Sequence, residues 1–286
     1  MWGLFPLYWP LLKPAGAVEI LAHRIFWSLA VMAVLILVLK RRSRLAAVLA
    51  NTRTRTILTI AAVVIAVNWG TYIWGVNNDH VVETSLGYFI NPLVTVLMGV
   101  VILGERLRAL QWVAMAVAAV AIIGIAVEYG RPPWVALVLA FSFGSYGLAK
   151  KKANAGAVES LTVETLVLTP VAIAYLAWLM AQGSSEFGHH GPGHVALIVG
   201  TGIITALPLI CFGAAATRVS MTTLGLLQYI TPTAQFAIGV LVFDEPMPVM
   251  RWVGFALVWV ALAIFTVESL NHRRRQFQLT TEASAI

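Results

Sequence analysis

The chain contains 286 residues, of which 60% are hydrophobic and only 11% are charged, and its formal net charge is +7. About a quarter of the residues of a soluble domain are charged, so this composition excludes an ordinary soluble fold. The basic residues stand in short clusters between apolar stretches, which argues against a nucleic-acid-binding face. The single cysteine, Cys211, excludes an intramolecular disulfide.

Apolar stretches of about 20 residues, enough to span a hydrocarbon core about 30 Å thick, follow one another along the chain. They cover residues 18–39, 57–77, 82–103, 110–127, 133–149, 158–181, 195–216, 222–243 and 249–267. These stretches predict an all-α integral membrane protein.

A shorter apolar piece, 1–12, precedes these stretches and is too short to cross the core as a helix. It does not resemble a signal peptide, because it has no basic start and no small-residue cleavage site. We interpret it as the end of a first helix that is truncated at its N-terminus, which places Met1 inside that helix and gives ten transmembrane helices. The alternative is a first helix that is short by design.

An internal duplication is indicated by the segment Ala15–Glu19, which recurs letter for letter as Ala155–Glu159, 140 residues later (155 − 15). A single offset that holds across both halves of a chain is typical of a repeat. The same offset aligns Pro92 with Pro232, Gly99 with Gly239, Glu105 with Glu245 and Trp112 with Trp252. We therefore predict a first repeat over 1–128, a second repeat over 133–268 and a cytoplasmic tail over 269–286.

The basic clusters predict the topology. With ten helices, most of the 19 Lys and Arg residues fall on one side, and the positive-inside rule then places both termini in the cytoplasm. A repeat with an odd number of helices enters the membrane upside down in its second copy. Inverted repeats are typical of carriers that expose a central site to either side in turn, although a duplication can also build a merely stable bundle.

Two ionisable residues lie inside predicted spans, where charge is costly and usually faces a cavity or a partner. They are Arg24 and Glu164, which the 140-residue offset (164 − 24) aligns. Because they enter from opposite membrane faces, we expect two separate cavity-facing charges that anchor a substrate or take part in gating. The alternative is that both side chains extend to the nearest interface. His23 and Glu164 are the candidates for proton coupling.

Polar residues and prolines also lie near the middle of the bilayer. A proline frees the carbonyl four residues earlier, so Pro92 and Pro232 free those of Tyr88 and Gln228. Pro208 aligns with Asn68, and we treat the three prolines as hinges, although prolines without such a role are common in membrane helices. The predicted substrate-binding set is Arg24, Asn68, Tyr72, Tyr88, Asn91, Glu164, Gln228, Tyr229, Thr231 and Gln235.

Enzyme and metal chemistry find little support in the sequence. The loop 189–194 contains three histidines, but its glycines and proline do not fix a ligand geometry. No zinc-protease, nucleophile-elbow or phosphate-loop motif is present. We expect no enzymatic activity, no cofactor and no metal.

Several motifs match a known family. They are Trp2–Trp9, Glu19–Arg24, Asn68–Trp74, Glu83–Leu93 and Leu224–Thr233. Together they resemble the RarD proteins, bacterial permeases of the EamA group in the drug/metabolite transporter superfamily. The resemblance covers residues 1 to 268, although family members begin earlier than this chain.

The resemblance implies ten helices as two EamA repeats, a bacterial inner-membrane location and a name linked to chloramphenicol sensitivity. The superfamily pattern lines a central cavity with the first four helices of each repeat. It thereby implies that Arg24, Asn68, Tyr88 and Asn91 lie near the cavity, with Glu164, Gln228 and Thr231 opposite.

Our leading hypothesis is a secondary transporter that moves a small organic metabolite or drug by alternating access. Arg24 favours an anionic or carboxylate-bearing solute. The alternatives are an integral-membrane lipid-modifying enzyme and a non-transporting assembly or regulatory subunit. The expected partners are a small-molecule substrate and the lipid bilayer, not nucleic acid, and a homodimer is left open.

Overall fold

The computed structural model describes residues 1–77, 81–128 and 134–242, and a further helical segment at positions 249, 252–253, 256–257, 259–261, 263–264 and 267–268. These residues are all helix, turn or coil, without a strand. The elements, in which η denotes a 3₁₀ turn, are η1 (Trp2–Leu4), α1 (Phe5–Tyr8), η2 (Trp9–Leu12), α2 (Ala17–Val38), α3 (Arg42–Ala50), α4 (Thr52–Asn77), α5 (Val81–Leu103), α6 (Ala109–Glu128), α7 (Trp134–Ala153), α8 (Ala157–Ala181), α9 (Gly191–Arg218), α10 (Met221–Gln228) and α11 (Ile230–Leu241).

The helix ends follow the local sequence. Helix α8 ends just before Gly183, whose φ of +65° suits a residue without a Cβ atom. The last turn of helix α7 contains Lys150, Lys151 and Lys152, whose positive charges interact favourably with the negative end of the helix dipole. Helix α10 begins after Ser220, whose hydroxyl oxygen accepts the backbone N–H of Thr223 at 3.0 Å. Polar caps and glycine therefore delimit elements whose interiors are apolar.

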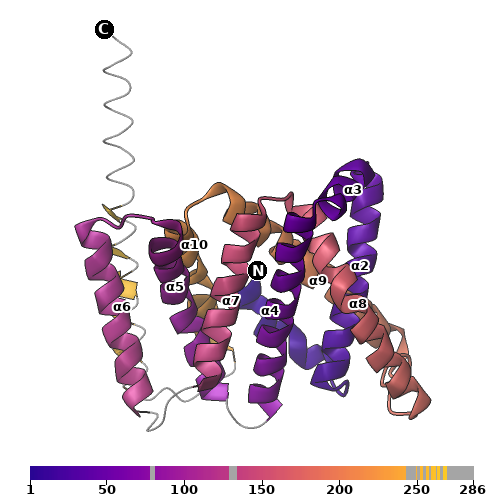
Figure 1. Ribbon diagram of the computed structural model, residues 1–286. Helices are drawn as coiled ribbons and strands as arrows, with labels where there is room; N and C mark the ends of the chain where they lie inside the picture. The colour runs from indigo at the N-terminus through magenta and orange to yellow at the C-terminus, as the bar shows by residue number, and fades with distance from the viewer. Residues whose placement is uncertain are drawn as a thin grey trace.

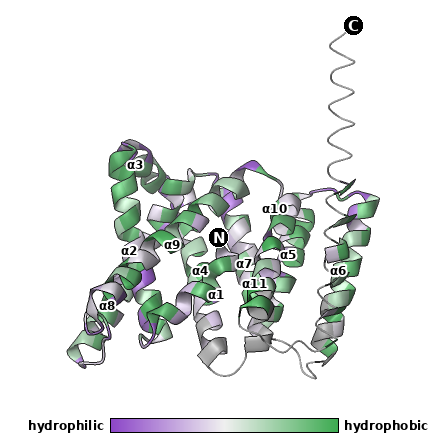
Figure 2. Ribbon diagram, turned by 180° about the vertical axis from the view of Figure 1, so that it is seen from behind, coloured by the Kyte–Doolittle hydropathy of each residue, from purple (hydrophilic) through white to green (hydrophobic). Residues whose placement is uncertain are grey.

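Long helices run roughly alongside one another, with α6 at one edge of the molecule and α2 and α8 at the other (Figure 1). Five of the described helices are long and apolar enough to cross a membrane: α2, α4 over Thr52–Tyr72, α5 over Leu86–Leu103, α8 and α9. Hydrophobic residues are spread along all the labelled helices (Figure 2). Large apolar side chains such as Val34, Val101 and Val171 are exposed there, as suits a surface solvated by lipid.

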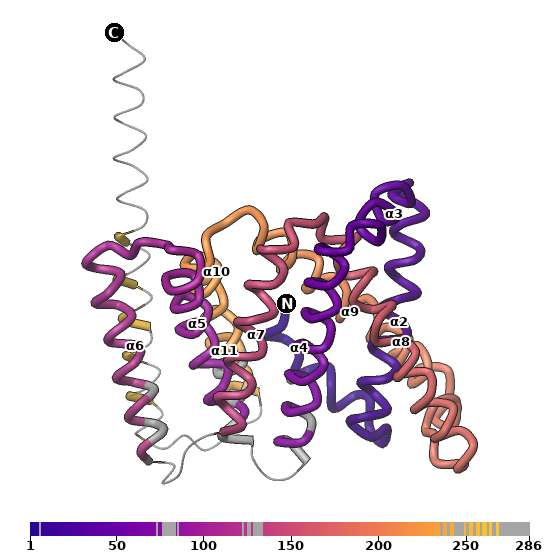
Figure 3. Tube along the Cα trace, in the orientation of Figure 1, coloured from indigo at the N-terminus to yellow at the C-terminus, as the bar shows by residue number. Residues whose placement is uncertain are grey.

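Helices from the two halves of the chain are interleaved. Helix α7, from the second half, packs between α4 and α5 of the first half (Figure 3). The N-terminal turns η1 and η2, in exchange, contact α11 and α9 of the second half. Helices at equivalent positions in the repeat also pack on each other, α2 on α8 and α5 on α10. The helices of each half are therefore buried partly against helices of the other half.

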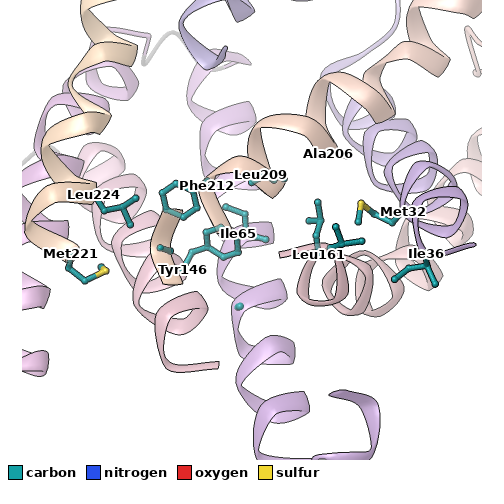
Figure 4. Packing of buried hydrophobic residues seen from close by; sticks show 13 residues of the cluster. Met32, Ile36, Ile65, Tyr146, Leu161, Ala206, Leu209, Phe212, Met221 and Leu224 are labelled. Carbon is teal, nitrogen blue, oxygen red and sulfur yellow. The ribbon is translucent and has the colours of Figure 1, made fainter. Parts of the chain in front are cut away.

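The largest core cluster joins both halves. Met32 and Ile65 come from the first half, and Tyr146, Leu209 and Phe212 come from the second (Figure 4). The rings of Tyr146 and Phe212 stack with their centroids 5.8 Å apart and an interplanar angle of 12°. The apolar contacts that hold the bundle together thus run across the sequence repeat.

Two segments differ from the expected spans, and one helix, α3, was not expected. Residues 1–12 form three short helical turns rather than one helix, with Pro6 and Pro10 inside them. The span expected over 222–243 breaks at Tyr229, because Pro232 has no N–H to donate to the Gln228 carbonyl. The basic cluster after α2 forms the short exposed helix α3. The tail 269–286 lies outside the described residues, and the last span lies only partly within them.

Candidate functional site

The side chain of Arg24 lies between the N-terminal turns and helices α4 and α9. Its Nε donates a hydrogen bond to Thr205 Oγ1 of α9 at 3.0 Å. The ring centroids of Trp9 and Trp69 lie 4.7 and 5.0 Å from the guanidinium carbon. Both indole faces therefore make cation–π contacts with the same cation. Arg24 is thus held by side chains of three elements, η2, α4 and α9, and is only partly exposed.

Two tyrosines lie next to this cation. Tyr72 of α4 and Tyr88 of α5 are in edge contact, with ring centroids 5.8 Å apart. Both lie close enough to Arg24 for their phenol groups to interact with it electrostatically. The structure thus brings together three residues of the predicted set, from three helices.

A small cavity begins at the partners of Arg24. Thr205 and Trp69 line one part of it, and Glu164 lines another. The remaining lining residues are Ile25, Ser28, Ile65, Tyr146, Leu161, Thr165, Leu168 and Leu209. Both halves of the chain contribute to the wall, which is mostly apolar with a few hydroxyl groups. The enclosed space is about 10 Å³, enough for roughly one water molecule, so an organic ligand would enter only if the surrounding helices moved apart.

Glu164 belongs to a buried polar network. Its Oε1 lies 2.6 Å from Lys150 Nζ, and only 2% of the Glu164 side chain and 1% of the Lys150 side chain are exposed. The Tyr146 hydroxyl donates to Glu164 Oε2 at 2.9 Å. Lys150 Nζ also donates to Ser160 Oγ at 2.8 Å. The two charges neutralise each other and are hydrogen-bonded, which is the condition for burying an ion pair in a membrane helix bundle.

The mid-bilayer amides form contacts between helices. Asn68 Nδ2 donates to the Leu139 carbonyl and to Ser142 Oγ of α7, both at 2.9 Å. Asn91 Nδ2 donates to Gln228 Oε1 and joins α5 to α10. Asn91 Oδ1 and Gln228 Nε2 are buried without a hydrogen-bond partner. Two further predicted residues thus meet directly and retain unused polar atoms.

The hinge prolines have different surroundings. Pro92 and Pro208 lie inside the continuous helices α5 and α9, whereas Pro232 is the third residue of α11, just after the break at Tyr229. Helix α10 approaches Pro92 closely: a Cβ atom added to Gly225 would lie 2.7 Å from the Pro92 carbonyl oxygen. Only glycine permits this crossing of α5 and α10.

Other members of the predicted set lie elsewhere. Tyr229 is buried with an unpartnered hydroxyl and lines a second, apolar cavity with Pro92 and Leu226. Thr231 is half-buried, and its backbone oxygen lies near Gly3. The side chain of Gln235 lies outside the described residues.

The two Ala-Gly-Ala-Val-Glu copies hold opposite ends of the α2–α8 pair. The Glu19 carboxylate accepts hydrogen bonds from Ser185 Oγ at 2.8 Å and from the Glu186 N–H at 2.9 Å, just after α8 ends. Glu159 forms an ion pair with Arg41, just after α2 ends, at 3.2 Å. Each glutamate therefore joins the start of its own helix to the segment that follows the helix of the other copy.

The histidines have separate surroundings. The His23 ring lies 4.7 Å from the Phe187 ring, and both of its nitrogens are buried without a partner. His190 Nε2 lies 2.6 Å from Glu186, and His194 contacts the Leu12 carbonyl at 3.0 Å. Among the described residues, no group of three potential ligands is placed to hold a metal ion.

Lys150 and Thr205 were not among the site residues predicted from the sequence. Lys150 is the first residue of the run Lys150–Lys152, one of the basic clusters from which the topology is predicted. Successive residues of a helix point about 100° apart, so three lysines in a row cannot all face water when the helix is packed on both sides. That periodicity was the signal for a buried lysine. Thr205 gave no comparable signal, because hydroxyl residues are common in membrane helices.

The comparisons with known proteins identify the family of the chain. The sequence model of the EamA-like transporter family matches residues 1–127 and 132–267. The chain belongs to the EamA-like transporter family. It is 58% identical over 275 residues to "Protein RarD" of Streptomyces exfoliatus, covering 96% of this chain and 87% of that protein.

A more distant relative carries a transporter name. It is "Uncharacterized transporter YojE" of Bacillus subtilis, 41% identical over 278 residues, with 96% of this chain and 92% of that protein covered. A solved structure titled "Crystal structure of protein" shares the fold, with a TM-score of 0.66, 17% identity and 93% of each chain covered. Membership of this family and the apolar helices identify a multi-pass membrane protein of a transporter family.

Proposed function

We propose that the protein is a secondary active transporter, a permease that moves a small organic metabolite or drug across the bacterial inner membrane by alternating access. The observation that carries the proposal is the cavity between the partners of Arg24 and the Glu164–Lys150 pair. Both halves of the chain form its wall, so a movement of one half against the other changes access to it. The transporter names of relatives support the same conclusion.

The proposed architecture has ten spans in two inverted repeats, 1–128 and 133–268, with both termini in the cytoplasm. The exchange of packing, in which α7 lies on the first half and the N-terminal turns lie on the second, supports it. Reciprocal packing of this kind is expected when two copies of one unit are related by a pseudo-two-fold axis.

In this proposal, Arg24, Tyr72 and Tyr88 contact the substrate on one side of the cavity, and the Glu164 network forms the other side. Asn68, Asn91, Gln228, Tyr229, Thr231 and Gln235 complete the predicted set. Pro92, Pro208 and Pro232 are the proposed hinges. Glu164 and His23 remain the candidates for proton coupling. The unpartnered ring nitrogens of His23 favour it as a group that takes up a proton without breaking an ion pair.

The test is flux in liposomes that contain only the purified protein. A thermal-shift screen against a metabolite library selects ligands, and uptake of each is then measured with and without a pH gradient. The variant Arg24→Ala is expected to abolish flux while the protein still inserts into membranes. Arg218→Ala is the matched control, because Arg218 is exposed and its side chain donates to Ala214 on its own helix.

Two results would count against the proposal. Unchanged flux in Arg24→Ala would remove Arg24 from the site. If no ligand found by the screen crosses the liposome membrane, the protein is not a transporter by itself, and a role as an assembly or regulatory subunit becomes the better account.

A further inference from the structure

Resting on the proposed function, we propose that the Arg24 site selects small organic acids and binds their carboxylate group along the free edge of the guanidinium. The apolar body of the same molecule would lie along the cavity beside the site, once the helices around that cavity move apart. The substrate class is therefore a carboxylate with a compact hydrophobic part, and not a neutral or cationic solute.

The first argument is a charge count. The buried acids near α2 already have partners: Glu164 pairs with Lys150, and Glu159 pairs with Arg41. Glu19 accepts its hydrogen bonds from the loop after α8. Among the described residues, Arg24 forms no ion pair. Arg24 is only partly exposed and lies against two indole rings, and a cation in such surroundings without a counter-ion is costly, so a bound anion offsets that cost.

The second argument is the unused hydrogen-bonding capacity of Arg24. A guanidinium carries five N–H donors, and only the Nε–H is donated, to Thr205. No described residue accepts from the terminal nitrogens. These are the groups that bind a carboxylate through two parallel hydrogen bonds.

The third argument is the position of the aromatic rings. Trp9 and Trp69 present their faces to the guanidinium carbon from different elements, η2 and α4. Contacts with ring faces hold the cation in place but do not satisfy its N–H donors. Tyr72 and Tyr88 place phenol groups near the same cation and add potential donors for an anion.

The fourth argument concerns the rest of the ligand. The cavity that Thr205 and Trp69 line continues along Ile25, Leu168 and Leu209. An inorganic anion gains nothing from these side chains, whereas a hydrocarbon or aromatic group buries apolar surface against them. Arg24 does not itself line this cavity, but its partners Thr205 and Trp69 do, so a molecule bound to the guanidinium has an apolar wall beside it. That neighbourhood favours an organic acid over an inorganic anion.

The experiment uses matched pairs of probes that differ only in charge. Phenylacetate is compared with phenylacetamide, and hexanoate with hexanamide, by thermal shift and tryptophan fluorescence of the purified full-length protein. Phenyl phosphate distinguishes a carboxylate site from a general oxyanion site. We expect each carboxylate to bind at least tenfold more tightly than its amide, which corresponds to about 1.4 kcal/mol.

Two variants test whether Arg24 provides this selectivity. Arg24→Gln is expected to abolish the preference for the acids, whereas Arg218→Gln keeps it. Arg24→Lys keeps the charge but loses the bidentate geometry, so an intermediate preference is expected. If Arg24→Gln does not give a monodisperse protein, Arg24→Lys decides the matter: an unchanged preference overturns the proposal. Equal binding of acids and amides by the unmodified protein, or tighter binding of phenyl phosphate, also overturns it.

The outcome separates this inference from the transport function. If carboxylates bind through Arg24 but no bound probe crosses a liposome membrane, the transport proposal fails and the carboxylate site stands. If neutral or cationic solutes are transported while carboxylates neither bind nor cross, the carboxylate site fails and transport stands.

Discussion

Positions 24 and 164 are equivalent in the sequence repeat but have opposite electrostatic surroundings. Glu164 lies in a closed network in which a lysine, a tyrosine and its own carboxylate satisfy one another. Arg24 has one hydrogen bond and two aromatic faces, and no described acid neutralises it. The comparison indicates that the charge at position 164 is satisfied within the protein, whereas the cation at position 24 keeps hydrogen-bonding capacity for a ligand.

The largest expected effect concerns the Glu164 network. Lys150→Met removes one member of the buried pair and leaves the Glu164 carboxylate unpaired, so we expect a loss of about 3–5 kcal/mol of stability. Thermal unfolding of the detergent-solubilised protein measures it. The double variant Lys150→Met/Glu164→Met removes both charges and is expected to recover most of the loss. A double variant as unstable as the single one would contradict a mainly structural role for the pair.

A smaller change in stability is expected at Arg24. Arg24→Gln removes a cation that no described acid neutralises, so the loss of its aromatic contacts is offset by the lower cost of burial, and the net change stays within about 1 kcal/mol. The same thermal unfolding experiment measures it. A loss as large as that of Lys150→Met would mean that position 24 is as structural as position 164.

The smallest effects are expected at Glu19 and Glu159, the glutamates that stand five residues before positions 24 and 164 (24 − 19 and 164 − 159). Glu159→Gln loses the ion pair with the partly exposed Arg41, which is worth no more than about 1 kcal/mol. Glu19→Gln keeps an oxygen acceptor for Ser185 and the Glu186 N–H, so its loss should be a few tenths of a kcal/mol. Thermal shifts of the two variants measured side by side check the order. A larger loss of stability in Glu19→Gln than in Glu159→Gln would show that the Glu19 contact stabilises the α2–α8 packing more than the Glu159 contact does.

A fourth prediction concerns the crossing that holds the two halves together. Gly225→Ala places a Cβ atom against the Pro92 carbonyl oxygen and the Val96 side chain, so α10 must move away from α5. Overpacking of this kind costs about 1–3 kcal/mol. Gly193→Ala, where no atom lies within 4 Å of the added Cβ, is the matched control. Equal unfolding temperatures for the two variants would contradict a tight crossing.

The sequence predicted the positions of most helices because long apolar runs bounded by charges and glycine determine where a chain enters and leaves a bilayer. It also indicated that Arg24 and Glu164 would have separate surroundings. The partner of Glu164 was not predicted, because Lys150 lies 14 residues earlier (164 − 150), on the preceding helix α7, in a basic cluster that the predicted topology already explained. The break at Tyr229 is a related case: Pro92 occupies the equivalent position to Pro232 and leaves α5 continuous. Whether a proline kinks or breaks a helix depends on neighbouring helices, which no local pattern encodes.

The interleaving of α7 with α4 and α5 has a consequence for biogenesis. Both earlier helices leave the ribosome before α7 has been translated, so the faces that will contact it are first covered by lipid or by the insertion machinery. Severing the chain between residues 128 and 134 should therefore give two fragments that accumulate only when they are synthesised together. We therefore expect the first half, made alone, to leave exposed the faces of α4 and α5 that α7 covers in the full chain.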